Sequence, residues 1–129
     1  MGQNFVADPN TVRRIAKLAC VGTSDQVVEI GAGLGSLTLA LADTGAAVTA
    51  LENDRGVVPV LREIVADRPN VEVIEGDAMR LDWDTTLDPN HRWVLVANLP
   101  YNVATPLVCD LLDEVPQVRR ILVMVQREV

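Results

Sequence analysis

Apolar residues along this chain gather in short, nearly continuous runs, and the segments between the runs carry apolar positions at helical spacing. The runs have the length of β-strands, and most of them end in glycine or in polar residues. The pattern therefore predicts strands that alternate with helices. The predicted strands cover 27–30, 46–54, 71–78, 92–100 and 119–126.

Helical spacing is clear near the start of the chain, where Asp8 suits a helix cap and Pro9 the first helical position. The apolar residues that follow share one side of this helix: Val12, Ile15, Ala16 and Ala19. A second helix is predicted over 36–45 and a third after Asp54. A fourth is predicted to open at Thr105-Pro106, with one apolar face made by Leu107, Val108, Leu111 and Leu112.

Buried strands that alternate with helices are typical of a parallel sheet covered on both faces. With right-handed crossovers, the prediction is an α/β fold with a doubly wound, Rossmann-like parallel sheet of five strands in one domain, residues 1–129. Ligands bind such sheets at the carboxyl ends of the strands. Polar or glycine residues follow four of the runs there: Gly31, Glu52, Asp77 and Asn98. The chain ends on its fifth strand, so we expect it to be an incomplete fragment.

Composition narrows the function classes. The chain has 129 residues, a net charge of −7 and a single lysine, so its charge has the wrong sign for gripping a nucleic-acid backbone. No apolar run is long enough to cross a bilayer, and we expect a cytoplasmic protein without a membrane partner. Cys20 and Cys109 lie far apart and are expected to be small core side chains in a reducing compartment.

The sequence Gly31-Ala-Gly33-Leu-Gly35 predicts a tight turn from strand to helix, where the backbone approaches a ligand closely. Glu52 follows about 20 residues later, where a carboxylate can accept both hydroxyls of a ribose. These two features would suit an oxidoreductase that binds a nicotinamide dinucleotide. However, Ser36 stands where the dinucleotide fingerprint needs its last glycine, and the turn has no basic residue for a phosphate.

The combination resembles the S-adenosylmethionine-dependent methyltransferases. The resemblance implies that the turn containing Gly31 and Gly33 passes under the methionine part of the cofactor and that Glu52 holds the ribose. It also implies that Asp77 accepts from the adenine amino group, with the Ala78 backbone beside it. The cofactor is a sulfonium cation without phosphates, and an acidic pocket suits such a ligand.

Asn98-Leu99-Pro100-Tyr101, expected where a buried strand passes into a loop, resembles the motif of methyltransferases that act on exocyclic amino groups. The resemblance implies that the Asn98 side-chain oxygen and the Leu99 carbonyl accept the two amino hydrogens. Pro100 would keep that carbonyl aimed, and Tyr101 would stack on the base.

Four segments together resemble the ribosomal RNA adenine dimethyltransferases: residues 2–5 (GQNF), 29–38, 98–106 and 123–129. This resemblance implies that Gln3, Asn4 and the Val6 backbone close over the cofactor. It also implies two successive methylations on each of two adjacent adenosines near the 3′ end of small-subunit RNA, within the precursor particle of the small subunit.

The usual family chain continues with further strands and a small helical domain, which would carry most of the RNA contact. We therefore expect this fragment to bind cofactor and to methylate poorly alone. The alternatives are a large-subunit enzyme of the macrolide-resistance type, the oxidoreductase, and a noncatalytic RNA-binding or assembly module. The oligomeric state is not determined by the sequence.

Other polar residues receive a plainer interpretation. His91 is expected in a solvated loop, and no metal site is expected around Asp82, Asp84 and Asp88. Arg119-Arg120 is expected to be a solvated pair at a strand entrance, although it could touch RNA.

Overall fold

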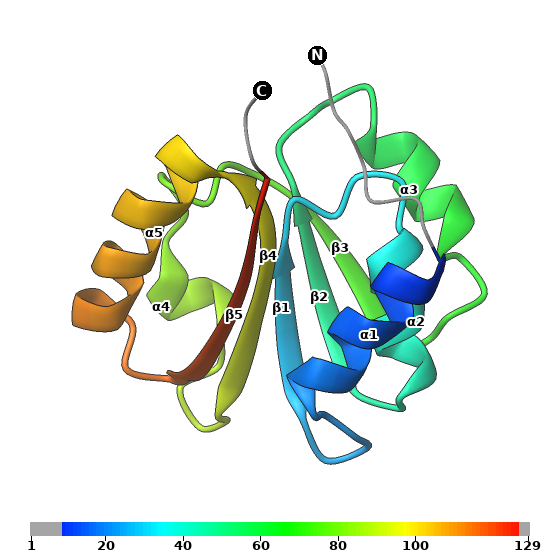
Figure 1. Cartoon of the computed structure of the whole chain (residues 1–129), viewed down its shortest axis with the longest axis horizontal. Coiled ribbons are helices and arrows are strands. Elements are labelled where there is room, and N and C mark those ends of the chain that lie inside the picture. The colour runs from blue at the N-terminus through cyan, green and yellow to red at the C-terminus, as the bar shows by residue number, and fades with distance from the viewer. Residues whose placement is uncertain (1–8, 127–129) are drawn as a thin grey trace.

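The structure is a computed structural model and describes residues 9–126. Its centre is a five-stranded sheet in the order β3-β2-β1-β4-β5, in which every neighbouring pair is parallel. Helices cover both faces, so the predicted doubly wound α/β fold is confirmed (Figure 1). The strands are β1 Gln26–Ile30, β2 Ala47–Glu52, β3 Val71–Glu75, β4 Trp93–Pro100 and β5 Val118–Gln126.

Two sets of helices enclose the sheet, one set on each face (Figure 1). One face is covered by α1 (Pro9–Ala19), α2 (Ser36–Asp43) and α3 (Val58–Ile64), and the other by α4 (Trp83–Thr86) and α5 (Tyr101–Glu114). Because side chains alternate along a strand, Val27 of β1 packs toward α1 and α2, while Val28 and Ile30 pack toward α5. Burial of both faces explains the continuous apolar runs of the sequence.

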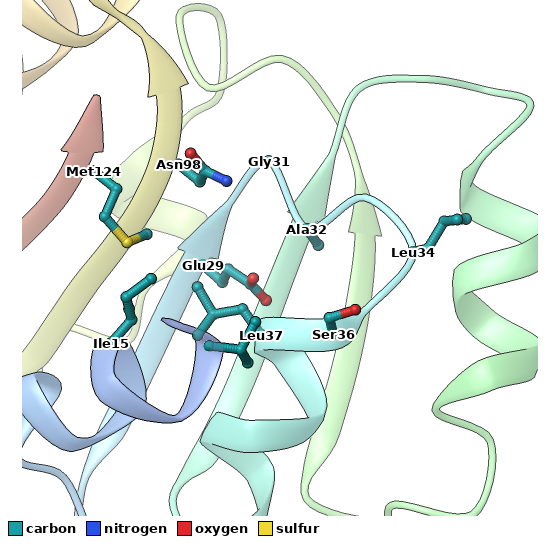
Figure 2. A pocket seen from close by; sticks show the side chains of 10 residues that line it. Ile15, Glu29, Gly31, Ala32, Leu34, Ser36, Leu37, Asn98 and Met124 are labelled. Atoms are coloured by element: carbon teal, nitrogen blue, oxygen red, sulfur yellow. The ribbon is translucent and has the colours of Figure 1, made fainter. Parts of the chain in front are cut away.

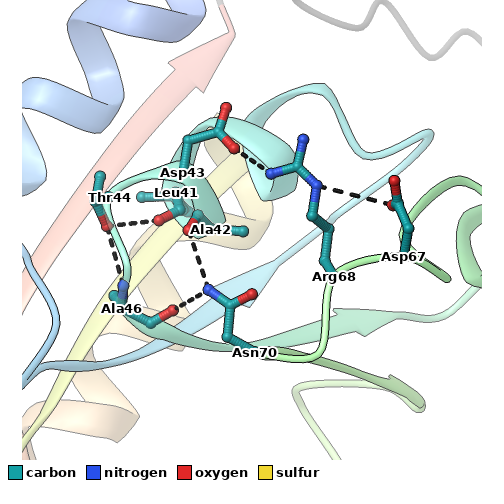
Figure 3. Close-up of polar contacts among 8 residues, drawn as sticks. All are labelled: Leu41, Ala42, Asp43, Thr44, Ala46, Asp67, Arg68 and Asn70. Carbon is teal, nitrogen blue, oxygen red and sulfur yellow. Dashed lines mark hydrogen bonds and ion pairs between the residues drawn. The ribbon is translucent and has the colours of Figure 1, made fainter.

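Side-chain contacts connect the residues just before β3 to the connection between α2 and β2 (Figure 3). The Asn70 side-chain amide, just before β3, donates to the carbonyl oxygens of Ala42 (3.0 Å) and Ala46 (2.8 Å). Arg68 forms an ion pair with Asp43 at the end of α2. These contacts fix the α2–β2 connection against the entry to β3.

The predicted start of the last helix is wrong, as is the loop expected before it. Strand β4 continues to Pro100, and α5 begins directly at Tyr101 rather than at Thr105. Pro106 therefore lies inside α5, where its missing N–H leaves the carbonyl of Asn102 without the helical donor. Asn102 is exposed, so water can supply that bond. The expected apolar face is present, since Leu107 and Leu111 are buried.

The prediction for the two cysteines is also wrong, because both are exposed. Cys109 lies two residues from each of the buried Leu107 and Leu111, which turns it to the opposite side of α5. Cys20 follows the last residue of α1 with a left-handed backbone, φ 55°. The predicted Asp8 cap lies outside the described residues. Within the described part of the chain, no helix has the length and apolar character needed to cross a bilayer.

Candidate functional site

The carboxyl ends of β1 and β4 meet at the glycine turn, between the two halves of the sheet. Gly31 follows β1 with φ 80°, and a Cβ at this position would lie 3.0 Å from the Asn98 backbone oxygen. The Gly31 N–H donates to the Leu51 carbonyl at 3.0 Å, which fixes the turn against β2. Glycine is required here for both reasons, the backbone conformation and the close approach of β4.

Glu52 ends β2 and binds the glycine turn through its carboxylate. Its Oε1 accepts from the Gly33 N–H at 2.8 Å, and its Oε2 accepts from the Asp54 N–H at 3.0 Å. An ionised carboxylate has about four acceptor positions, so both oxygens can accept further bonds from a ligand. Glu52 therefore holds the turn and can still receive hydroxyl groups.

Asp77 lies beside Glu52 because β2 and β3 are neighbours that pair Glu52 with Glu75. The Gly76 N–H donates to the Glu52 carbonyl at 3.0 Å. Asp77 accepts from the Met79 N–H at 2.9 Å, and its carboxylate is 40% exposed. Ala78 is half-buried against the α5 side of the core. The two predicted acidic residues thus form one rim at the carboxyl ends of adjacent strands.

Asn98, near the end of β4, has a side-chain oxygen, Oδ1, that is buried and accepts no hydrogen bond. It is the one such side-chain atom among the described residues. A buried acceptor without a donor costs roughly 1–3 kcal/mol, so native structures rarely keep one without a role. This oxygen is therefore available to a donor that comes from a ligand.

A cavity of about 160 Å³ opens beside Asn98 and the glycine turn. Figure 2 shows the Asn98 amide and the Glu29 carboxyl group among otherwise mainly apolar side chains. The cavity brings together the predicted Gly31 and Asn98, whereas Glu52, Asp77 and Ala78 do not line it. Pockets for whole cofactors measure about 300–1,000 Å³, so this one suits only part of a ligand. The lining residues are Val12, Ile15, Glu29, Gly31, Ala32, Leu34, Ser36, Leu37, Asn98 and Met124.

Glu29 is a site residue that the sequence analysis did not assign. It lies in β1, points toward α2, is only 2% exposed and accepts a hydrogen bond from the Thr38 hydroxyl. Burial raises the pKa of the Glu29 carboxyl group to about 8, and the nearby Glu52 charge adds to the rise. Near neutral pH this group is therefore mostly protonated. An acidic residue inside an apolar strand, directly before the glycines, was the signal that could have identified it.

Several predicted site residues are not described by the structure. Gln3, Asn4 and Val6 lie outside the described residues, as do the side chains of Pro100 and Tyr101. The backbone of these last two residues ends β4 and begins α5. Leu99 is half-buried, and its side chain packs against the α5 side of the core.

A family model and a curated relative both relate this chain to enzymes that methylate ribosomal RNA. The family model described as ribosomal RNA adenine dimethylase matches residues 1–129. The chain is 50% identical to the ribosomal RNA small subunit methyltransferase A of Corynebacterium jeikeium, and the match covers 100% of this chain and 43% of that protein. The chain thus spans less than half the length of this curated relative.

Solved structures agree with the fold. The 23S rRNA methyltransferase ErmE is 32% identical with a TM-score of 0.82, over 95% of this chain and 48% of that one. The N-terminal domain of EvdMO1, solved with S-adenosylhomocysteine (SAH) bound, is 26% identical with a TM-score of 0.58. It covers 73% of this chain and 38% of its own.

Proposed function

Because the chain belongs to the ribosomal RNA adenine dimethylase family, we propose that it is the cofactor-binding part of an adenosine dimethyltransferase. The whole enzyme would place two methyl groups on the exocyclic amino group of each of two adjacent adenosines near the 3′ end of small-subunit ribosomal RNA. Residues 1–129 would be an incomplete methyltransferase domain of this cytoplasmic enzyme, and the precursor of the small subunit would be its partner.

The residues at the carboxyl ends of the strands fit S-adenosylmethionine. The cavity beside Gly31 is mainly apolar, includes the Glu29 carboxyl group and suits the methionine part of this ligand by its size. Glu52 and Asp77 form an acidic rim beside it, at the distance of neighbouring strands, and would accept from the ribose hydroxyls and the adenine amino group. Among the described residues, no basic one lines the cavity itself, and Arg80 approaches only Asp77 of the rim, at 3.9 Å, so the charge around the cavity suits a cation better than a phosphate.

The unpartnered oxygen of Asn98 carries the proposal for catalysis. Adenine's amino nitrogen is a weak nucleophile, because its lone pair is delocalised into the ring. Asn98 Oδ1 would accept one amino hydrogen and the Leu99 carbonyl the other, which favours a tetrahedral nitrogen with an available lone pair. S-adenosylmethionine, when bound, supplies a methyl group on a positively charged sulfur. Alignment of the nitrogen with that methyl group supplies up to about 7–11 kcal/mol in favourable cases.

Pro100 and Tyr101 complete the proposed corner. The ring of Pro100 limits the backbone beside the Leu99 carbonyl, and Leu99, as the residue before a proline, is held in an extended conformation. Tyr101 at the start of α5 would stack on the target base, a contact worth about 1–3 kcal/mol. Gln3, Asn4 and the Val6 backbone would close over the cofactor.

Sequence identity to known enzymes supports methylation of small-subunit RNA rather than of large-subunit RNA. The curated small-subunit relative is 50% identical to this chain, whereas the large-subunit enzyme ErmE is 32% identical. Both comparisons cover nearly all of the chain, so the difference does not come from unequal coverage.

Titration calorimetry tests the cofactor site in this chain. We expect S-adenosylmethionine to bind, and Glu52→Ala to weaken binding at least tenfold, because it removes the ribose acceptor and the anchor of Gly33. Glu72→Gln, an exposed change on the same sheet, is the matched control and should leave the affinity unchanged. Folded protein that binds no S-adenosylmethionine would refute the proposed site.

A methylation assay tests the role of Asn98 in the full-length enzyme. Asn98→Ala should lower kcat by about 10²–10³, by analogy with the loss of one preorganised hydrogen bond in a transition state. Cofactor affinity measured on the same variant separates loss of binding from loss of turnover. Unchanged kcat would refute the role of the Asn98 oxygen.

A further inference from the structure

A second polar groove lies at the amino ends of the strands, away from the glycine turn. Its lining includes Arg92, Arg119 and Arg120, together with Asp25 and His91. These residues belong to the β1 entry, the β4 entry and the start of β5, which Figure 1 shows at the opposite end of the sheet from the Gly31 turn. The length of β1, about 17 Å at 3.3 Å per residue, separates the groove from the proposed site.

The groove is basic in a chain that is acidic overall. Three arginines line it against one aspartate, although the whole chain carries a net charge of −7. The Asp25 carboxylate accepts from the Gly22 N–H at 2.7 Å, which stabilises part of its charge locally. A second acid, Asp88, does not line the groove; its Oδ2 lies 3.7 Å from Nε2 of His91.

The three arginines of the groove have no acidic partners, unlike three of the seven other lysines and arginines in the described residues. Arg55, Arg68 and Arg80 each lie within 4 Å of a carboxylate. In the described part of the chain, no such ion pair involves Arg92, Arg119 or Arg120. Among the described residues, the side chain of Arg120 donates a hydrogen bond to the Cys20 carbonyl, at 3.4 Å. Their positive charges therefore remain available to an anion.

An irregularity in strand pairing explains why two consecutive arginines line one groove. Trp93 pairs with Val118 and Val94 pairs with Arg120, so Arg119 is an extra residue on β5. In a regular strand, Arg119 and Arg120 would point to opposite faces of the sheet. An extra residue redirects the side chains beside it, and such features are often found where a side chain must be aimed.

We propose that this groove, lined by Arg92, Arg119 and Arg120, binds the phosphate backbone of the substrate RNA at a distance from the methylated nucleotides. The inference rests on the proposed function, because that function supplies the RNA. Arginine presents a planar fork of donors that matches phosphate oxygens, and phosphate contacts of this kind fix the register of a nucleic acid rather than its sequence. The net charge of −7 repels RNA at long range, but three arginines gathered in one groove give a local surface of the opposite sign.

The test measures binding of a fluorescein-labelled single-stranded RNA by fluorescence anisotropy at several salt concentrations. For the 129-residue chain, each phosphate contact should contribute about −0.7 to the slope of the logarithm of the RNA association constant against the logarithm of the salt concentration. Replacing all three arginines by alanine should make the slope shallower by about 2 and weaken binding at least tenfold at low salt. Arg62→Ala, an exposed change on α3, is the control and should alter neither quantity.

Cofactor titration of the same variants separates the two proposals. The triple alanine variant should bind S-adenosylmethionine like the unchanged chain, which also shows that it is folded. A variant with each of the three arginines replaced by lysine should retain most of the salt slope. An unchanged slope in the triple alanine variant, absence of RNA binding at low salt, or equal competition by polyglutamate would overturn the RNA groove. None of these outcomes would affect the proposed cofactor site, which fails only if S-adenosylmethionine does not bind.

Discussion

The buried Glu29 carboxyl group makes the stability of this protein depend on pH in a direction that can be worked out. Its pKa is about 8 in the folded chain, against an ordinary value of 4.5, and the main cause is burial. The folded state therefore holds a proton that the unfolded state releases between these two pH values. By linkage, the contribution is fully present below about pH 4.5 and is lost as the pH rises through about 8.

The magnitude follows from the same pair of values. A difference of about 3.5 units at 1.36 kcal/mol per unit gives an upper bound of about 5 kcal/mol. This bound is a large part of the stability of an ordinary domain, about 5–15 kcal/mol. Relaxation around the ionised group and entry of water reduce the loss, so we expect a few kcal/mol.

Glu29→Gln isolates this effect, because the glutamine oxygen can still accept from the Thr38 hydroxyl while the side chain no longer titrates. Urea unfolding, followed by circular dichroism at about pH 5, 7 and 9, gives the free energy of unfolding of both proteins. The variant should gain stability relative to the unchanged chain by at least about 1 kcal/mol between pH 5 and 9. Glu72→Gln, an exposed change on β3, should show no such trend. A difference between Glu29→Gln and the unchanged chain that stays constant with pH would refute the reasoning.

Two further predictions concern the framework around the site. Gly31→Ala should lower the free energy of unfolding by about 1–3 kcal/mol, because the new Cβ would sit on a backbone with φ 80° and lie 3.0 Å from the Asn98 backbone oxygen. Gly22→Ala is the control, because its Cβ would have nothing within 4 Å. Equal losses of stability in the two variants would contradict the explanation. Asn70→Ala should cost about 1–3 kcal/mol in urea unfolding, because the Ala42 and Ala46 carbonyls lose their side-chain donor. Asn90→Ala, in an exposed turn, is the matched control, and a similar loss there would argue against this role.

The pKa of Glu29 could not be predicted from the amino-acid sequence alone. The sequence places this acid inside an apolar strand, but burial, the Thr38 hydroxyl and the charge of Glu52 come together only through packing of α2 on β1 and pairing of β1 with β2. These contacts, rather than the residue type, set its pKa. The same holds for Asn98, because a sequence can predict an amide near a ligand but not that its oxygen is buried without a donor.

The wrong prediction for the start of the last helix also arises from contacts between residues distant in the chain. A proline usually marks a helix start, so Thr105-Pro106 predicted one, yet α5 begins at Tyr101 with Pro106 inside it. Packing of Leu107 and Leu111 against the sheet accounts for the outcome, because it stabilises the helix on the far side of the lost hydrogen bond.

The sequence by itself determined the alternation of strands and helices, the parallel sheet, and the glycine, acidic and amide residues at the strand ends. Those features follow from local periodicity and from the geometry that parallel strands share. Tertiary structure alone decided which of these residues line one cavity, which carboxyl group is protonated, and that Arg92 shares a groove with Arg119 and Arg120 from a distant segment. The physical reason is that burial, desolvation and charge proximity depend on neighbours distant in the chain, which no short stretch of sequence specifies.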